Sequence, residues 1–114
     1  MKIINTTKNV ILADNVTLAQ TVLARLKGLL FRKEFRNGEA LIIKPCNSIH
    51  TFFMRFPIDV IFIDSNDKIV KIRKEIKPFR ATPVYFKSKF VIEFPSGTVE
   101  VTNTTESDIL LIEP

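Results

Sequence analysis

One stretch of nineteen residues, from Cys46 to Asp64, constrains this chain more than any other. It reads CNSIHTFFMRFPIDVIFID and holds the only cysteine, the only histidine and four of the ten phenylalanines. Its apolar residues belong in a core. Its polar residues, with Thr51 and Asp59 among them, are the most plausible reactive or binding groups in the sequence. We therefore expect the core and a candidate site to share this part of the chain.

The composition indicates a packed globule rather than a disordered chain. The chain has 114 residues, 46% of them hydrophobic, and we expect one domain over residues 1–114. A single cysteine cannot form an internal disulfide, and the first fifteen residues lack the continuous apolar segment of a signal peptide. No apolar run approaches the roughly 20 residues that span a bilayer. These features predict a cytoplasmic protein that does not contact a membrane.

Helical periodicity occurs in one place. Leu18, Val22 and Leu26 recur at helical spacing, which predicts an α-helix over residues 18–27. Thr17 is the expected N-cap, because its hydroxyl can accept from a free backbone N–H. Gly28 is the expected end, because glycine readily adopts the left-handed conformation that closes a helix.

Strand patterns dominate the rest of the chain. The clearest is a β-hairpin over residues 58–73, with a turn at residues 64–67. Further short strands are expected at residues 3–4, 10–12, 40–44, 49–54, 90–94, 98–102 and 108–113. We therefore predict a mainly β fold, an antiparallel β-sandwich or barrel-like domain of about seven to nine short strands with one α-helix near residues 18–27.

The central stretch also carries a family pattern, formed by Cys46, Ile49-His50-Thr51, Met54, Pro57-Ile58-Asp59 and Phe62 to Asp64. Together with residues 21–29, 77–80 and 93–97, it closely resembles the prokaryotic family known as domain of unknown function 192. The resemblance covers roughly residues 10–114. Its His-Thr-Phe-Phe-Met form is similar to that of members without a signal peptide. The resemblance implies a β-sandwich-like fold with one helix and no established reaction.

Cys46, His50 and Asp59 suggest two kinds of chemistry. They are good zinc ligands, and they are also the residue types of a nucleophile, a base and an orienting acid. On an extended strand, however, Cys46 and His50 would lie about 13 Å apart. No glycine-rich loop follows Cys46 to bind an oxyanion. We therefore expect no metal and no cofactor. The alternative function is a cysteine- and histidine-dependent or metal-assisted enzyme that uses these three residues.

A structural role explains the same residues. Alternation through residues 49–54 would bury His50 and Thr51 in a central strand, with Asp59 buried nearby. Buried polar groups need hydrogen-bond partners, and Arg25 is the expected cation for Asp59.

This structural role leaves room for a pocket at the mouth of the sandwich. We expect that pocket to bind a small anionic ligand or a protein partner, and we favour a non-enzymatic binding domain. The expected ligand-binding residues are His50, Thr51, Met54, Arg55, Asp59 and Arg80, with Arg25 and Cys46 as structural or possible site residues.

The net charge of +5 is unevenly distributed. Residues 68–89 carry eight basic side chains and one acidic one, whereas residues 90–114 carry five acidic side chains and no basic one. The two segments are expected to complement each other in the fold. The alternative is single-stranded nucleic-acid binding by residues 68–89, where Phe79, Tyr85 and Phe86 lie among the cations. Because no nucleic-acid-binding motif accompanies them, we do not expect nucleic acid as the partner.

Overall fold

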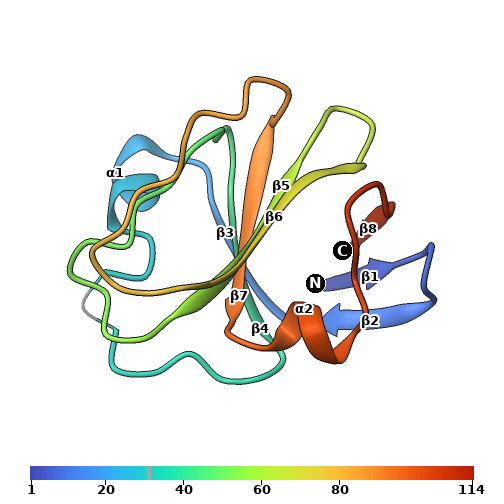
Figure 1. The fold of residues 1–114 in the computed structure, drawn as a ribbon, viewed down its shortest axis with the longest axis horizontal. Coiled ribbons are helices and arrows are strands. Elements are labelled where there is room, and N and C mark those ends of the chain that lie inside the picture. The colour runs from blue at the N-terminus through green and yellow to red at the C-terminus, as the bar shows by residue number, and fades with distance from the viewer. Residues whose placement is uncertain (31) are drawn as a thin grey trace.

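The computed structural model of the protein describes residues 1–30 and 32–114. These residues form eight strands in two sheets and two short helices (Figure 1). The five-stranded sheet has the order β3-β4-β7-β5-β6 and the three-stranded sheet the order β2-β1-β8. The elements are β1 (Lys2–Asn5), β2 (Val10–Ala13), β3 (Asn15–Ala19), α1 (Val22–Lys27), β4 (Glu39–Ile43), β5 (Ile58–Ile63), β6 (Ile69–Ile76), β7 (Phe90–Pro95), α2 (Thr98–Val101) and β8 (Leu110–Glu113).

The five-stranded sheet is the middle layer of the molecule. Figure 1 shows β1, β2 and β8 on one side of it and α1 on the other. On the first side, Ile61, Ile92 and Phe94 pack with Ile3 and other residues of the smaller sheet. On the second side, Val60, Phe62 and Val91 pack beneath Leu29, Ile49 and Met54. Every residue of β5 and β7 is buried, because both faces of these central strands are covered.

The prediction of a mainly β fold is confirmed, and the two sheets do not close into a barrel. The predicted hairpin is also confirmed, since β5 pairs with β6 in antiparallel register. Its turn forms as expected. The Asp64 carboxylate accepts hydrogen bonds from the backbone amides of Asn66 and Lys68, at 2.8 and 3.1 Å. Local turn chemistry therefore fixed this part of the fold.

The helix lies within the predicted stretch but begins at Val22 instead of Leu18. Its N-cap is Thr21, whose hydroxyl accepts from the amide of Ala24 at 3.0 Å, so the prediction of Thr17 as the cap is wrong. Thr17 and Leu18 belong to β3, which pairs in parallel with β4. Pairing with a neighbouring strand has overridden the local helical spacing here.

Residues 98–102 were expected to form a strand, and this prediction is wrong: α2 occupies most of them. Gly97 takes the left-handed conformation, with φ 97°, and turns the chain out of β7. The Asp59 carboxylate then accepts from the amides of Gly97 and Val99. A residue about 40 positions away in the sequence thus holds this turn.

The expected strand at residues 49–54 is also absent from the assigned elements. Phe53 has a φ of 64°, which is incompatible with an extended strand, and only His50 forms an isolated bridge, with Ala81. The segment is an irregular loop over the α1 side of the sheet. None of the helices among the described residues is long and apolar enough to cross a membrane.

Candidate functional site

A cavity of about 270 Å³ lies between α1 and the five-stranded sheet. Residues of α1, β4, β7 and the loop after β4 line it, so it is built by the side of the sheet opposite β1, β2 and β8. Its apolar lining includes Val22, Leu26, Leu29, Ile43, Ile49 and Met54. Its polar lining is Arg25, Lys27, Cys46, Ser48, His50 and Glu93. The cavity is therefore mostly apolar with a few convergent polar groups, as small-molecule sites commonly are.

Glu93 is the unusual residue of this cavity. It lies in the middle of β7, opposite Leu41 of β4 and Val60 of β5, and is only 2% exposed. Its Oε1 atom is buried and has no hydrogen-bond partner among the described residues. Burial raises the pKa of this carboxyl to about 8. At neutral pH the side chain is therefore a protonated carboxylic acid, which can donate a hydrogen bond.

Arg25 brings a cation to the same cavity from the last turn of α1. Its Nη1 donates to the carbonyl of Pro45 at 3.2 Å, while its Nε is buried and has no partner in the described part of the chain. The predicted pairing of Arg25 with Asp59 is wrong. The backbone instead satisfies Asp59, and the buried Nε of Arg25 has no partner among the described residues.

Asp59 and Thr51 have structural partners. Asp59 is fully buried and accepts from the amides of Glu75, Gly97 and Val99, at 2.9, 3.1 and 2.9 Å. Thr51 is also fully buried. Its hydroxyl donates to the carbonyl of Lys77 at 2.6 Å and accepts from the amide of Arg80 at 2.9 Å. The expectation of buried, hydrogen-bonded polar groups is thus correct for these two residues, and both hold loops in place.

His50 was expected to be buried, and the structure places it in an exposed position at the cavity. The chain leaves the strand conformation after it, so its side chain is not held in a core. Its Nδ1 accepts from the amide of Phe52 at 3.3 Å, and its ring lies 5.1 Å from the Phe52 ring. Met54, which is buried, also lines the cavity.

Cys46 lies at the same cavity, half-buried. Its Sγ donates to the carbonyl of Ser48 at 3.0 Å, and burial raises the pKa of the thiol. The loop therefore brings Cys46 and His50 to one cavity, whereas Asp59 lies on the opposite face of the sheet. The thiol is kept protonated rather than activated. Within residues 1–30 and 32–114, no three acidic, histidine or cysteine side chains are grouped to hold a metal.

Arg55 and Arg80 are exposed and do not belong to the described lining of this cavity. Arg80 instead lies beside an aromatic cluster in which the Phe79 ring is 6.4 Å from Phe52 and 5.7 Å from Phe53. Its Nη1 atom is 3.4 Å from the Phe79 carbonyl oxygen. The two arginines predicted for the pocket thus lie outside it, and Arg25 and Lys27 supply the cations of its lining.

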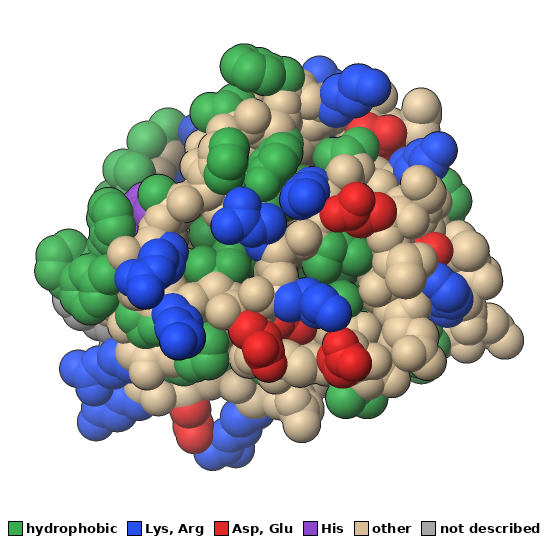
Figure 2. Space-filling view, viewed as in Figure 1, with side chains coloured by type: hydrophobic (Ala, Val, Ile, Leu, Met, Phe, Trp, Pro, Cys, Tyr) green, Lys and Arg blue, Asp and Glu red, His purple; other side chains and the backbone are tan. Residues whose placement is uncertain are grey.

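The basic segment is partly neutralised by the acidic end of the chain. Lys74 pairs with Glu100 at 3.1 Å, and Lys71 lies 3.8 Å from Glu106. Figure 2 shows acidic side chains beside the Lys and Arg side chains in the middle of this face. These contacts agree with the expectation that the two segments complement each other.

A second hollow, of about 420 Å³, lies near β2 and α2 and is lined by residues including Ile11, Asp14, Gly38 and Val101. Its described lining holds no buried polar atom without a partner. The α1 cavity is therefore the better candidate site. Sequence reasoning missed its central residue, Glu93, although one acid inside the apolar run FVIEFP was the available signal.

The fold and the cavity together define a mainly β domain with a small, mostly apolar site beneath a short helix. The model of the family DUF192, described as "Uncharacterized ACR, COG1430", matches residues 3–112, and the chain belongs to this family. The resemblance inferred from the central stretch is thereby confirmed.

Archaeal relatives of this chain are described only as UPF0127 proteins. The one from Thermococcus sibiricus is 33% identical over 111 residues, which cover 93% of this chain and 71% of that protein. The one from Pyrococcus horikoshii is 35% identical over 103 residues, which cover 86% of this chain and 87% of that protein. Neither name assigns a ligand or a reaction.

Two crystal structures share the fold at 20% sequence identity. A protein of unknown function from Novosphingobium aromaticivorans gives a TM-score of 0.84 and covers 97% of this chain and 82% of its own. A putative transcription regulator from Sinorhizobium meliloti gives a TM-score of 0.82 and covers 96% of this chain and 89% of its own. At this level of identity the likeness concerns the fold alone.

Proposed function

We propose that this protein is a small-molecule-binding domain whose site is the cavity between α1 and the five-stranded sheet. The polar end of the ligand lies at Glu93 and Arg25, and its body packs against the apolar lining. The protein acts by binding rather than by catalysis. Its proposed location is the cytoplasm, which the single cysteine supports.

The unsatisfied carboxyl of Glu93 is the observation that carries this proposal. A buried polar atom without a partner costs about 1–3 kcal/mol, and buried polar groups in native proteins are normally paired. The Oε1 atom of Glu93 carries this free-energy cost. Arg25, which lines the same cavity, also has an unpaired atom, its Nε. A bound ligand that hydrogen-bonds both groups would remove the penalty. The two unpaired atoms therefore support a binding role for the cavity.

Catalysis by Cys46, His50 and Asp59 is the weaker alternative. The three side chains do not share a site, and burial disfavours the thiolate that a cysteine nucleophile needs.

Docking of a protein partner over the exposed aromatic cluster of Phe52, Phe53 and Phe79 would be compatible with a filled cavity. The cavity, however, is where buried groups remain unpaired.

The test compares two tryptophan substitutions on exposed positions of α1. Val22 lines the cavity and is 65% exposed, whereas Leu23 is 78% exposed and is not part of the lining. Val22→Trp should cover the cavity without disturbing the core, and Leu23→Trp is the matched control. A library of small acids, amines, amides and alcohols is screened by thermal shift against the wild type and both variants.

We expect at least one class of compound to raise the melting temperature of the wild type and of Leu23→Trp but not that of Val22→Trp. A ligand at 100 times its Kd stabilises a protein by about 2.7 kcal/mol, which such a screen detects. Equal responses of the two variants would place binding elsewhere and contradict the proposal. So would the absence of any response across all four classes.

A further inference from the structure

We propose that the ligand of the α1 cavity carries a carboxylate, which accepts one hydrogen bond from the protonated carboxyl of Glu93 and another from the Nε of Arg25. This inference rests on the proposed function and adds the chemical class of the ligand. It also assigns Glu93 the role of hydrogen-bond donor, which is uncommon for an acidic side chain.

The two unpaired groups of the cavity residues are both hydrogen-bond donors. The Nε of arginine is always a donor. Glu93 is buried in apolar surroundings, opposite Leu41 and Val60, and holds its proton at neutral pH. A protonated carboxyl offers one donor. The cavity therefore presents two donors to the ligand, so the ligand must present acceptors. The two oxygens of a carboxylate meet this requirement, and an O–H···O⁻ hydrogen bond is among the strong ones.

The charge of the cavity lining also bears on the class of ligand. Arg25 and Lys27 are the basic residues of the lining. Among the described residues that line the cavity, Glu93 is the one acidic residue. With Glu93 protonated, the lining has a net positive charge, which attracts an anionic ligand. An ammonium ligand would instead need an ionised Glu93 and would lie beside a guanidinium of like charge, which is unfavourable. Charge thus favours a carboxylate over an amine.

The size and the apolar walls of the cavity limit the body of the ligand. Its volume of about 270 Å³ lies just below the usual range for drug-sized ligands. Val22, Leu26, Leu29, Ile49 and Met54 supply the apolar walls. A short apolar chain or a single ring attached to the carboxylate would fill this space. Small monocarboxylic acids are therefore the class that fits best.

The proton on Glu93 gives this site a distinctive pH dependence. A carboxylate ligand requires the protonated form of Glu93, so its affinity should be nearly constant at pH 6–7 and fall about tenfold per pH unit above pH 8. An ammonium ligand would show the opposite trend, with affinity rising toward pH 8. The other titratable groups that face Glu93 at the cavity are Arg25, Lys27, Cys46 and His50. The Cys46 thiol, whose pKa is raised above 9.0, loses its proton at higher pH than Glu93 does.

The experiment is isothermal titration calorimetry from pH 6 to 9.5 with four matched six-carbon probes: hexanoate, hexylamine, hexanamide and hexanol. We expect hexanoate to bind most tightly and to lose affinity about tenfold per pH unit above pH 8. Glu93→Gln keeps an N–H donor and cannot ionise, so it should bind hexanoate without that loss. Glu93→Leu should weaken binding at least tenfold. Glu100→Gln, at an exposed residue of α2, is the matched control and should behave as the wild type.

The outcomes separate the two proposals. Tighter binding of hexylamine than of hexanoate, or hexanoate affinity that is unchanged in Glu93→Leu, would overturn the carboxylate assignment while leaving a binding cavity in place. Binding of none of the four probes, together with equal thermal responses of Val22→Trp and Leu23→Trp, would overturn the binding function itself. Circular dichroism of each variant establishes that it is folded.

Discussion

The two faces of the five-stranded sheet each bury one carboxylic acid, and they treat it in opposite ways. Asp59 of β5 and Glu93 of β7 lie one residue apart in the register of these paired strands, which places their side chains on opposite faces. Asp59 accepts three backbone hydrogen bonds. Glu93 has an oxygen with no partner in the described chain and a raised pKa.

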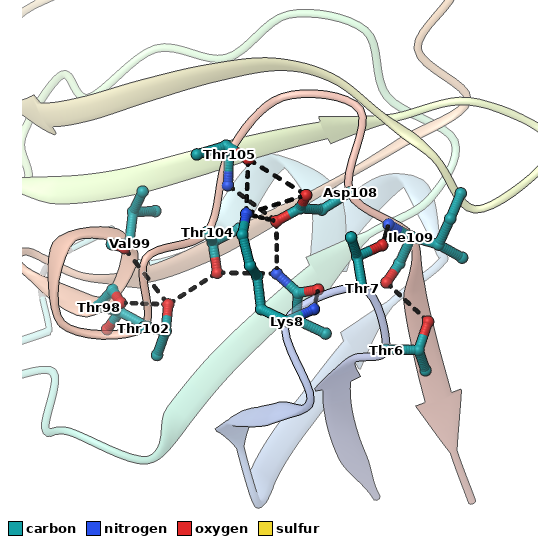
Figure 3. A network of polar contacts seen from close by, with 11 residues as sticks. Thr6, Thr7, Lys8, Thr98, Val99, Thr102, Thr104, Thr105, Asp108 and Ile109 are labelled. Carbon is teal, nitrogen blue, oxygen red and sulfur yellow. Dashed lines mark hydrogen bonds and ion pairs between the residues drawn. The ribbon is translucent and has the colours of Figure 1, made fainter.

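The polar groups on the Asp59 side of the sheet form connected networks. In the network of Figure 3, Asp108 accepts from the side chain of Lys8 at 2.9 Å and from the backbone of Thr105 at 3.0 Å. It also accepts from the Asn5 side chain at 2.8 Å, which links the two ends of the chain. Such satisfied groups specify the fold. Because Glu93 contributes no such link, we infer that its presence serves the cavity rather than the fold.

The largest expected effect concerns Asp59. Replacing Asp59 with alanine leaves the amides of Glu75, Gly97 and Val99 without their acceptor. Unfolding in urea should show a loss of about 3–5 kcal/mol in the free energy of unfolding. Glu93→Leu, which removes an unpaired carboxyl from an apolar setting, should raise this free energy by about 1 kcal/mol. If both variants lost a similar amount of unfolding free energy, the two faces of the sheet would not differ in the way inferred here.

The sequence predicted the central strands of the sheet and the burial of Asp59 better than it predicted the role of Glu93. The β5–β6 hairpin and the run of β7 follow from local alternation and turn residues, so these strands were placed nearly correctly. The burial of Asp59 and Thr51 was also expected, because both lie inside an apolar motif.

Their partners could not be predicted in the same way. Asp59 binds amides about 16 to 40 residues away, and Arg25 reaches the carbonyl of Pro45 rather than Asp59. These contacts depend on how the loops cross the sheet. The local spacing of apolar residues in the sequence carries no information about that path. Glu93 escaped attention because a single acid in a strand pattern usually marks an exposed position. Only the burial of both faces of β7 makes it unusual.

The stability of the protein between pH 4.5 and 8 should depend on Glu93. Burial raises the pKa of Glu93 from its ordinary value of 4.5 to about 8, so the folded state keeps a proton that the unfolded state has lost. Where the folded state binds more protons, stability falls as pH rises. We expect the free energy of unfolding of the wild type to fall across this window by up to about 1.4 kcal/mol per pH unit. In Glu93→Gln this contribution should be absent, and parallel pH profiles of the two proteins would contradict it.

The smallest effect is expected in acid, from the opposite side of the sheet. Burial raises the pKa of Asp108, but hydrogen bonds from Asn5, Thr105 and Lys8 outweigh it and lower the value from 3.8 to about 2. The folded state therefore binds fewer protons here, and the stability that Asp108 adds is present above pH 4 and lost as pH falls toward 2. The free-energy difference between the wild type and Asp108→Asn should shrink by about 1–2 kcal/mol between pH 5 and 2.

Urea unfolding at a series of pH values measures this acid limb, which is the change in the free energy of unfolding between pH 5 and 2. Glu93→Gln serves as the control. Protonation of Glu93 is complete in both the folded and the unfolded state below about pH 3.5, so Glu93→Gln should not change how the free energy of unfolding varies between about pH 3.5 and 2. Asp108→Asn should in turn leave the limb from pH 4.5 to 8 unchanged. If either substitution altered both limbs, the two carboxyls would be coupled through the sheet, and the separation between a face that holds the fold and a face that binds a ligand would fail.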